Sequence, residues 1–162
     1  MDTDIIFRKA VYKDKNQVSD VLLDFYNIEN FNEAINVFKM ELEKDYHYIV
    51  AIRKQKIIGL VTWVMHGLPK HGLFELDRIC LLSESRGRGI GKQLINALIE
   101  DARVWYESHK SSIRKLYILT HDENINAQAF YEAVGFQHET TLKNHYYNDK
   151  HERVYTKFFH NP

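Results

Sequence analysis

The sequence predicts an α/β fold built around a mixed β-sheet. Runs of β-branched and aromatic residues, typical of strands, alternate with segments in which apolar residues recur every three or four positions, as in helices. The chain has 162 residues, 44% of them hydrophobic, and is long enough to bury one core. Because no repeat, linker or low-complexity segment indicates a second domain, we expect a single domain over 1–162.

The order of these segments justifies the predicted fold class. From the N-terminus we expect a strand (5–10), two helices (14–27 and 31–44), an antiparallel hairpin (46–54 and 56–67), a strand (72–82), a helix ending near Ser108, a strand (114–121), a helix (126–134) and two strands (136–142 and 152–159). The long helix is predicted to carry one apolar stripe, formed by Ile90, Leu94, Leu98, Ala102 and Trp105. Elements in this order favour a sheet with mixed strand directions.

Charge and cysteine content exclude several classes of protein. Basic and acidic residues both number 22, so the formal net charge is zero, which argues against binding nucleic acid or a membrane surface through overall positive charge. The single cysteine, Cys80, excludes an internal disulfide. The N-terminal MDTDIIFRKA lacks the apolar stretch of a signal peptide and no window resembles a membrane span, so we expect a cytoplasmic protein.

The segment SRGRGIGKQ, residues 85–93, predicts a site for an anion. It contains three of the seven glycines and stands between a predicted strand and a predicted helix. N–H groups at a helix start have no partner within the helix, and glycines let phosphate oxygens approach them. The segment fails the P-loop pattern at Arg86 and Gln93, and the dinucleotide pattern G-x-G-x-x-G at Lys92. A pyrophosphate is the favoured ligand, and a tight turn with solvated arginines is the alternative.

Two motifs resemble those of the GNAT superfamily of N-acetyltransferases. Arg86, Gly89 and Gly91 match the family motif Q/R-x-x-G-x-G/A, and residues 124–136, NINAQAFYEAVGF, match N-x-x-A-x-x-F/L-Y-x-x-x-G-F at every fixed position. The resemblance implies a mostly antiparallel sheet, splayed between the strand before the glycine loop and the strand after the long helix. It also implies direct transfer of an acetyl group from acetyl-CoA to a primary amine.

The resemblance further implies which residues bind acetyl-CoA. The pyrophosphate is expected on the loop formed by Arg86, Gly87, Arg88, Gly89, Ile90, Gly91 and Lys92. The pantetheine arm is expected to pair with the backbone of Ile79, Cys80 and Leu81. Asn124 matches a family position that hydrogen-bonds this arm, although it fits a helix cap equally well. Cys80 is predicted to line the wall rather than act as a nucleophile, because no His or acid beside it in the sequence marks it as activated.

Glu75 is the predicted general base. An alkyl ammonium has a pKa of about 10.4 and must lose a proton before the amine attacks. Glu75 precedes Arg86 by eleven residues, the spacing at which several family members carry a general-base carboxylate. Asp77 shares its face of the strand, so it is a second candidate base or a group that attracts a cationic substrate. The alternative is that both are ordinary solvent-facing charges.

Tyr131 is the predicted general acid. It matches the family tyrosine that stands beside the sulfur and donates a proton to the leaving thiolate, and a phenol with a pKa of about 10 stays protonated for that task. The alternative is a tyrosine buried only for packing with Ala127, Phe130 and Val134.

The acceptor amine is less clearly indicated. The expected loop between the last two strands, within 142–159, contains Tyr146 and Tyr147 and loosely resembles the tyrosine-bearing hairpin of N-terminal protein acetyltransferases, whose phenols hold a peptide backbone. A polyamine or another small-molecule amine fits Glu75 and Asp77 equally well. The acceptor is therefore left open between a small amine and a peptide N-terminus.

The remaining expectations concern partners and a competing function. His138, His145 and His151 have no ligand spacing, so we expect no metal. We expect neither nucleic acid nor membrane as partner, and the oligomeric state is left open between monomer and homodimer. The alternative function is a non-catalytic domain that senses coenzyme A or a nucleotide. The presence of both Glu75 and Tyr131, which a pure binder would not need, favours the enzyme.

Overall fold

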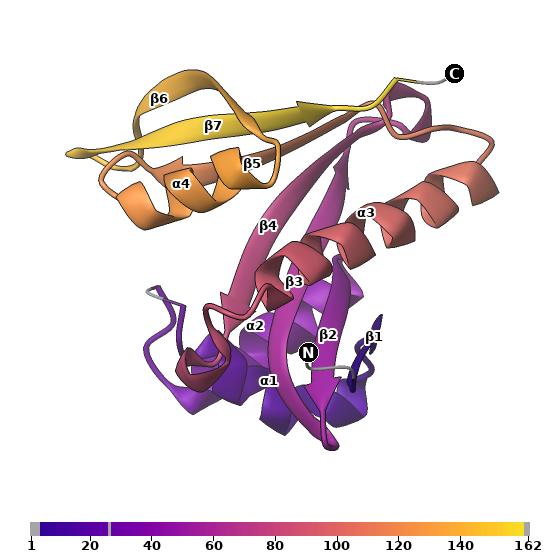
Figure 1. The fold of residues 1–162 in the computed structure, drawn as a ribbon, viewed down its shortest axis with the longest axis vertical. Coiled ribbons are helices and arrows are strands. Elements are labelled where there is room, and N and C mark those ends of the chain that lie inside the picture. Colours follow the sequence, from indigo (N-terminus) through magenta and orange to yellow (C-terminus); the bar gives the residue numbers. More distant parts are fainter. Residues whose placement is uncertain (1–3, 26, 161–162) are drawn as a thin grey trace. The chain divides into compact units, whose positions relative to one another are not determined.

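A computed structural model of the chain describes residues 4–25 and 27–160. Within these residues, seven strands form a sheet of order β1-β2-β3-β4-β5-β7-β6. The strands are β1 (Ile5–Lys9), β2 (His47–Arg53), β3 (Lys56–His66), β4 (Leu73–Leu81), β5 (Lys115–His121), β6 (Gln137–Tyr147) and β7 (Lys150–Phe158) (Figure 1). The α-helices are α1 (Lys15–Leu22), α2 (Phe31–Glu43), α3 (Ile90–Ser108) and α4 (Ile125–Ala133), with 3₁₀ turns η1 (Tyr12–Asp14), η2 (Pro69–His71) and η3 (Ser83–Ser85).

The strand directions confirm the predicted fold class. The pairs β1–β2, β2–β3, β5–β7 and β6–β7 are antiparallel, and β4–β5 is parallel. The sheet is therefore mixed and mostly antiparallel, with helices between its strands in the predicted order. None of the helices in the described residues is long and apolar enough to cross a membrane.

Contacts between residues divide the chain into two compact units. Unit 1 comprises Met1–Val64 and Arg78–Val104, and unit 2 comprises Met65–Asp77 and Trp105–Pro162. The division falls within β3, β4 and α3, so each unit contains part of these elements. The expectation of a single domain over 1–162 stays a prediction.

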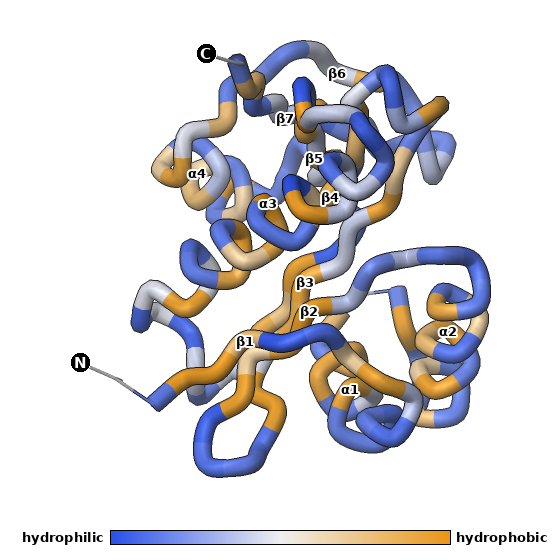
Figure 2. Tube along the Cα trace, turned by 90° about the vertical axis from the view of Figure 1, so that its right-hand side faces the viewer, coloured by the Kyte–Doolittle hydropathy of each residue, from blue (hydrophilic) through white to orange (hydrophobic). Residues whose placement is uncertain are grey.

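The core of unit 1 lies on both faces of β2 and β3, whose continuous hydrophobic runs are visible in Figure 2. Tyr48 and Val50 of β2 face α1 and α2, where they join a buried cluster that includes Val18 and Phe38. On the other face, the Trp63 indole N–H donates to Asp101 Oδ2 of α3 at 2.9 Å. Unit 1 is therefore a sheet between two layers of helix, because its central strands are buried on both sides.

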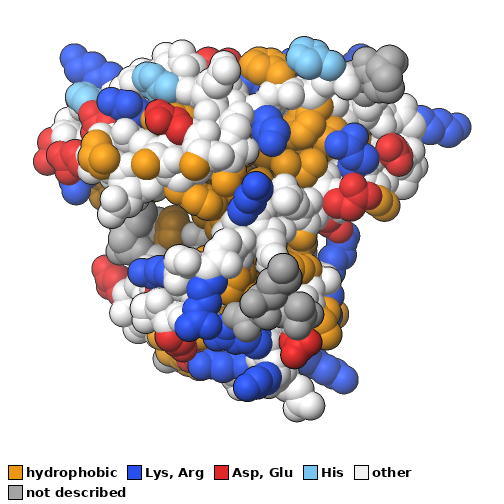
Figure 3. Space-filling model, in the orientation of Figure 1, with side chains coloured by type: hydrophobic (Ala, Val, Ile, Leu, Met, Phe, Trp, Pro, Cys, Tyr) orange, Lys and Arg blue, Asp and Glu red, His pale blue; other side chains and the backbone are white. Residues whose placement is uncertain are grey.

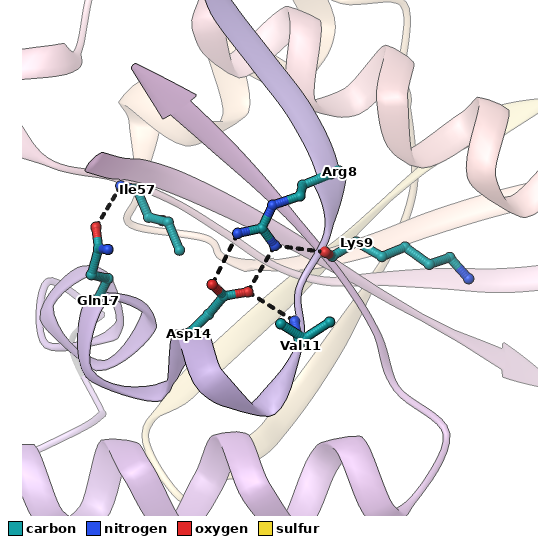
Figure 4. Close-up of polar contacts among 6 residues, drawn as sticks. All are labelled: Arg8, Lys9, Val11, Asp14, Gln17 and Ile57. Carbon is teal, nitrogen blue, oxygen red and sulfur yellow. Dashed lines mark hydrogen bonds and ion pairs between the residues drawn. The ribbon is translucent and has the colours of Figure 1, made fainter. Parts of the chain in front are cut away.

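Polar contacts fix the connection between β1 and α1 (Figure 4). The Arg8 guanidinium donates to both carboxylate oxygens of Asp14 at 2.8 and 2.9 Å, and the Val11 N–H donates to the same carboxylate at 2.8 Å. The hydrogen bond from Arg8 holds the pKa of Asp14 below its usual value. One turn further on, the Ile57 N–H donates to Gln17 Oε1 at 2.8 Å, which ties α1 to β3.

Unit 2 is built on β5, whose side chains alternate between two faces. Leu116 and Ile118 are buried on one face. On that face Tyr131 of α4 packs against Tyr155 of β7, with ring centroids 6.2 Å apart. Tyr117 and its neighbours at odd positions of β5 point to the opposite face. The two faces of unit 2 are therefore chemically different, one apolar and one polar.

The last hairpin differs from the prediction. The expected loop within 142–159 is wrong: β6 continues to Tyr147 and β7 begins at Lys150. Leu142 pairs with Glu152 and Tyr147 with Lys150, so residues 143–146 form a bulge opposite His151 alone. Asn144 has a φ of 49° and donates its N–H to His151 Nδ1 at 3.0 Å. The polar composition of this segment suggested a loop because a bulge uses the same residue types as a turn.

Two helices also differ in detail. α1 ends at Leu22 rather than at 27, because the N–H groups of Asp24 and Phe25 bond to carbonyls three residues back and tighten the chain; residue 26 lies outside the described residues. In α3 the predicted stripe holds through Ala102, but Tyr106 rather than Trp105 is fully buried. The Tyr106 hydroxyl donates to the Leu73 carbonyl at 2.7 Å, and burial raises its pKa to about 12.

Candidate functional site

The glycine loop joins β4 to α3 in unit 1. Gly87 and Gly89 have φ values of 75° and 78°, which residues with a Cβ rarely adopt. A Cβ built on either glycine would meet no atom within 4 Å. The space beside both residues is therefore open, and a ligand can approach their backbone directly.

The start of α3 supplies donors to this loop. The N–H of Gln93 donates to the Gly89 carbonyl at 3.3 Å, so the N–H groups of Ile90, Gly91 and Lys92 come before the first i→i−4 bond and have no acceptor within the helix. The helix dipole adds partial positive charge at the same end. These groups fit the oxygens of a pyrophosphate, which are the acceptors of hydrogen bonds and carry negative charge.

Basic side chains surround the loop. Arg86, Arg88 and Lys92 are exposed, and Figure 3 shows Lys and Arg side chains gathering over the segment between β4 and α3. Arg86 donates from Nε to the Leu81 carbonyl at 3.1 Å and lies 3.6 Å from the Asp24 carboxylate. Arg86 is therefore fixed to the end of β4, and its charge is partly offset by Asp24.

The predicted pantetheine segment, Ile79–Leu81, lies at the end of β4. Cys80 is buried in the core of unit 1, as expected for a wall residue, and a Cβ at Gly59 of β3 would lie 3.0 Å from its carbonyl oxygen. The register between β4 and β5 comprises three pairs among the described residues and ends at Glu75 and Tyr117. β4 therefore continues without β5 as its neighbour, which agrees with a splayed sheet.

Glu75 stands at the centre of a polar cluster in unit 2. His66 Nε2 lies 2.7 Å from Glu75 Oε2, and the Tyr117 hydroxyl donates to the same oxygen at 3.3 Å. The Glu75 side chain keeps 15% of its surface exposed. A carboxylate held by two neighbours and still open to solvent can accept a proton from a substrate, because its position is fixed and its lone pairs are not all used.

The charges around Tyr117 define the polar face of unit 2. Burial and the neighbouring Glu75 carboxylate raise the pKa of the Tyr117 hydroxyl, and Asp77 and Tyr146 add to this. Tyr117 is thus a neutral donor. Along β4, Glu75 and Asp77 alternate with the buried Phe74 and Leu76, so the two acids point to one face of that strand.

Tyr147 lies beside His121 of β5. Its ring centroid lies 6.3 Å from that of His121, and His121 contacts the buried carboxylate of Glu152. Burial raises the pKa of Glu152. The two adjacent tyrosines that the sequence grouped together thus have different neighbours.

Tyr131 is 5% exposed and lies on the opposite side of the sheet of unit 2. Its neighbours are Phe130, Phe136 and Tyr155, with ring centroids between 5.4 and 6.2 Å away. Gln128 and Tyr131 are the buried residues of α4, and Ala127, Phe130 and Val134 are half-buried. Because register partners share a face, Glu75 and Tyr117 point away from the face of Tyr155. Glu75 and Tyr131 therefore lie on opposite faces of the paired part of the sheet of unit 2.

Asn124 caps α4. Its Oδ1 accepts the N–H of Ala127 at 3.1 Å, which is the helix-cap alternative that the sequence left open. Gln128 of the same helix donates from Nε2 to the carbonyls of His121 and Asp122 at 3.1 and 2.9 Å. These contacts fix the start of α4, and through it the position of Tyr131.

Sequence reasoning missed His66 and Tyr117. Both contact Glu75, but they come from the end of β3 and the middle of β5. Tyr117 could have been proposed from alternation along 114–121, whereas His66 carried no signal because the end of a hairpin has no fixed neighbour in sequence. The described residues contain no group of three His, Cys, Asp or Glu placed to hold a metal ion.

A family model and several known proteins match the chain. The model of the acetyltransferase (GNAT) family matches residues 15–136. The spermine/spermidine N(1)-acetyltransferase of Bacillus subtilis is 29% identical over 138 residues, which cover 80% of this chain and 86% of that protein.

Solved structures match over almost the whole chain. A variant of the spermidine N-acetyltransferase of Vibrio cholerae superposes with a TM-score of 0.77 at 19% identity, covering 96% of this chain and 94% of the other. An aminoglycoside 6'-N-acetyltransferase complexed with coenzyme A superposes with a TM-score of 0.79 at 17% identity, covering 97% and 99%. At such identities these structures support the fold alone.

Proposed function

The chain belongs to the acetyltransferase (GNAT) family, and is an acetyl-CoA-dependent N-acetyltransferase; on that premise we propose that its acceptor is a polyamine or a similar cationic primary amine. We also propose that residues 1–162 form one catalytic domain. Glu75 is assigned as the base, Tyr131 as the acid, and the glycine loop as the pyrophosphate site. Asp77 and Tyr146 are assigned to the acceptor.

The acidic face of unit 2 is the observation that supports this acceptor. Glu75 and Asp77 alternate with the buried Phe74 and Leu76 along β4, so the two carboxylates point to one face of the strand. An amine that is protonated in solution is attracted to such a surface, and a second ammonium group would strengthen the attraction. The similarity of the chain to a spermine/spermidine N(1)-acetyltransferase agrees with a polyamine as the acceptor.

The proposed reaction needs three proton transfers. The Glu75 carboxylate takes one proton from the bound ammonium, and the neutral nitrogen attacks the acetyl carbonyl carbon. As the new C–N bond forms and the C–S bond breaks, the Tyr131 hydroxyl gives its proton to the departing sulfur. The nitrogen of the new amide then gives up its second proton, which restores the Tyr131 hydroxyl, and Glu75 releases its proton to solvent. His66 and Tyr117 hold the Glu75 carboxylate in place, so little conformational entropy is lost in positioning the carboxylate during the reaction.

The cosubstrate would be held by the residues of unit 1. Acetyl-CoA supplies an activated acetyl group as a thioester. The open space at Gly87 and Gly89 and the N–H groups of residues 90–92 fit its pyrophosphate. The β4 backbone at Ile79–Leu81, past the last pair with β5, has the extended form that a pantetheine amide can pair with. The Asn124 side-chain amide is assigned to the same arm.

Release of free thiol from acetyl-CoA with a panel of amines tests this function. The panel contains spermine, spermidine, a monoamine of similar length and a short peptide with a free N-terminus. We expect the polyamines to give the highest kcat/KM, with a preference that decreases as salt rises, because the attraction is electrostatic. A peptide that reacts faster than every polyamine would contradict the proposed acceptor while leaving the acetyltransferase activity intact.

Gly89→Val is expected to weaken acetyl-CoA binding by about tenfold or more. A valine cannot adopt the φ of 78° without strain, and its side chain enters the space assigned to the pyrophosphate. Calorimetry measures the affinity, and thermal unfolding checks that the fold survives. Gly135→Val is the matched control, because Gly135 also has a positive φ but lies outside the loop. Unchanged affinity in a folded Gly89→Val variant would remove the loop from the site.

A further inference from the structure

A cationic pocket of about 500 Å³ lies in unit 2. It is bounded by η2, by the segment that follows α3 and by the residues after β7, and its lining includes Lys70, His71, Lys110, Arg114, Phe159 and His160. No lining residue within the described part of the chain is acidic. The volume is within the range of sites for small molecules, about 300–1,000 Å³.

The positive charges of this pocket are not neutralised by the protein. Several basic side chains in the described residues form ion pairs, as in Arg8 with Asp14, Arg78 with Glu41 and Lys115 with Glu139. By contrast, Lys70 and Lys110 make no ion pair with any residue in 4–25 or 27–160.

The walls of the pocket are held together by hydrogen bonds. Arg114 donates from Nε to the His71 carbonyl at 3.0 Å and from its N–H to the Gly72 carbonyl at 2.8 Å. A Cβ at Gly72 would collide with the Ser112 carbonyl oxygen, so the two walls approach as closely as their backbones allow. The Phe159 N–H donates to the Arg114 carbonyl at 2.8 Å. The pocket is thus formed before any ligand arrives.

The lining combines charge with an apolar surface. The ring of Phe159 stacks on that of Phe74, with centroids 6.0 Å apart. The Leu68 N–H donates to His71 Nδ1 at 3.0 Å, so a neutral His71 carries its proton on Nε2 as a further donor. A rigid apolar surface beside several donors suits an organic anion better than a bare ion.

We propose that this pocket binds a small organic anion with at least two negative charges, at a site distinct from that of the acetyl-CoA pyrophosphate. Its charged groups are phosphates or carboxylates, which are the groups that lysine and arginine bind best. None of the described residues that line this pocket belongs to the glycine loop, 86–92.

Calorimetry with pyrophosphate tests the proposal on protein saturated with coenzyme A, so that the glycine loop is already filled. We expect one further binding event that weakens with rising salt. The double variant Lys70→Gln/Lys110→Gln should weaken it by about tenfold or more, since two charge-assisted contacts are lost. The matched control, Lys39→Gln/Lys143→Gln, removes the same charge from two exposed lysines elsewhere and should change the affinity little.

Citrate in place of pyrophosphate distinguishes the two kinds of anion. Tighter binding of citrate, with the same dependence on Lys70 and Lys110, would identify carboxylates as the preferred groups and still support the site. Absence of binding by both anions, or equal losses in the test and control variants, would overturn it. Acetyl transfer to amines is measured separately, so failure of this site leaves the proposed function untouched.

Discussion

Replacing Glu75 by glutamine is expected to lower kcat by a factor on the order of 10² to 10⁴ at neutral pH, which is the contribution of a positioned base. Glutamine keeps the size of the side chain and can still bond to His66 and Tyr117, so the cluster should persist. The defect should diminish as the pH rises towards the pKa of the amine, about 10.4, because the unprotonated acceptor becomes abundant. A pH–rate profile of both enzymes from neutral pH upward measures this.

Asp77→Asn is the matched control for Glu75→Gln. It removes one charge from the same face of β4 and should raise KM for a polyamine more than it lowers kcat, since Asp77 is assigned to attraction rather than proton transfer. If instead Asp77→Asn flattens the pH dependence and Glu75→Gln has a normal profile, the base is Asp77.

Replacing Tyr131 by phenylalanine is expected to lower kcat by about 10- to 10³-fold. The ring and its contacts with Phe136 and Tyr155 remain, so stability should change little. The loss is incomplete because a thiol with a pKa of about 8.5 can leave unprotonated. Affinity for acetyl-CoA should be nearly unchanged, since the missing contact exists only in the transition state. Single-turnover kinetics measure the chemical step directly.

Tyr155→Phe controls for the loss of a phenol in the same cluster. Its hydroxyl donates to Glu132 Oε1 at 3.2 Å, away from any proposed reacting atom, so we expect wild-type transfer and a small loss of stability. Wild-type single-turnover rates in Tyr131→Phe would make Tyr131 a core residue and remove the acid from the mechanism.

The sequence predicted elements with a strong local pattern and missed contacts set by register. β2 and β3 follow from continuous apolar runs, because both of their faces are buried, and α3 follows from hydrophobic periodicity, because only one of its faces is buried. The sequence could not decide whether Trp105 or Tyr106 is the buried residue in this turn of α3, because steps of three and of four residues both stay on one face of a helix. The hydrogen bond from the Tyr106 hydroxyl to the Leu73 carbonyl distinguishes the two.

Residues of the candidate site could be predicted only where they belong to a sequence motif. Gly87 and Gly89 could be identified because a positive φ selects glycine. Glu75 was predicted from spacing, but its partner Tyr117 depends on which residue of β5 lies opposite it. Strand pairing between distant segments leaves no trace in the spacing of either one, so the arrangement of His66, Glu75 and Tyr117 required the structure.

The bulge in β6 has a consequence for self-association. β6 lies at the margin of the sheet, and all but Leu142 of its residues are exposed. A straight exposed strand of this length would offer a continuous row of peptide groups to another chain and promote aggregation. The register shifts at His138–Thr140 and Leu142–Tyr147 interrupt that row, and Asn144 turns the backbone out of line. The irregular margin therefore makes β6 a poorer template for strand addition by another molecule.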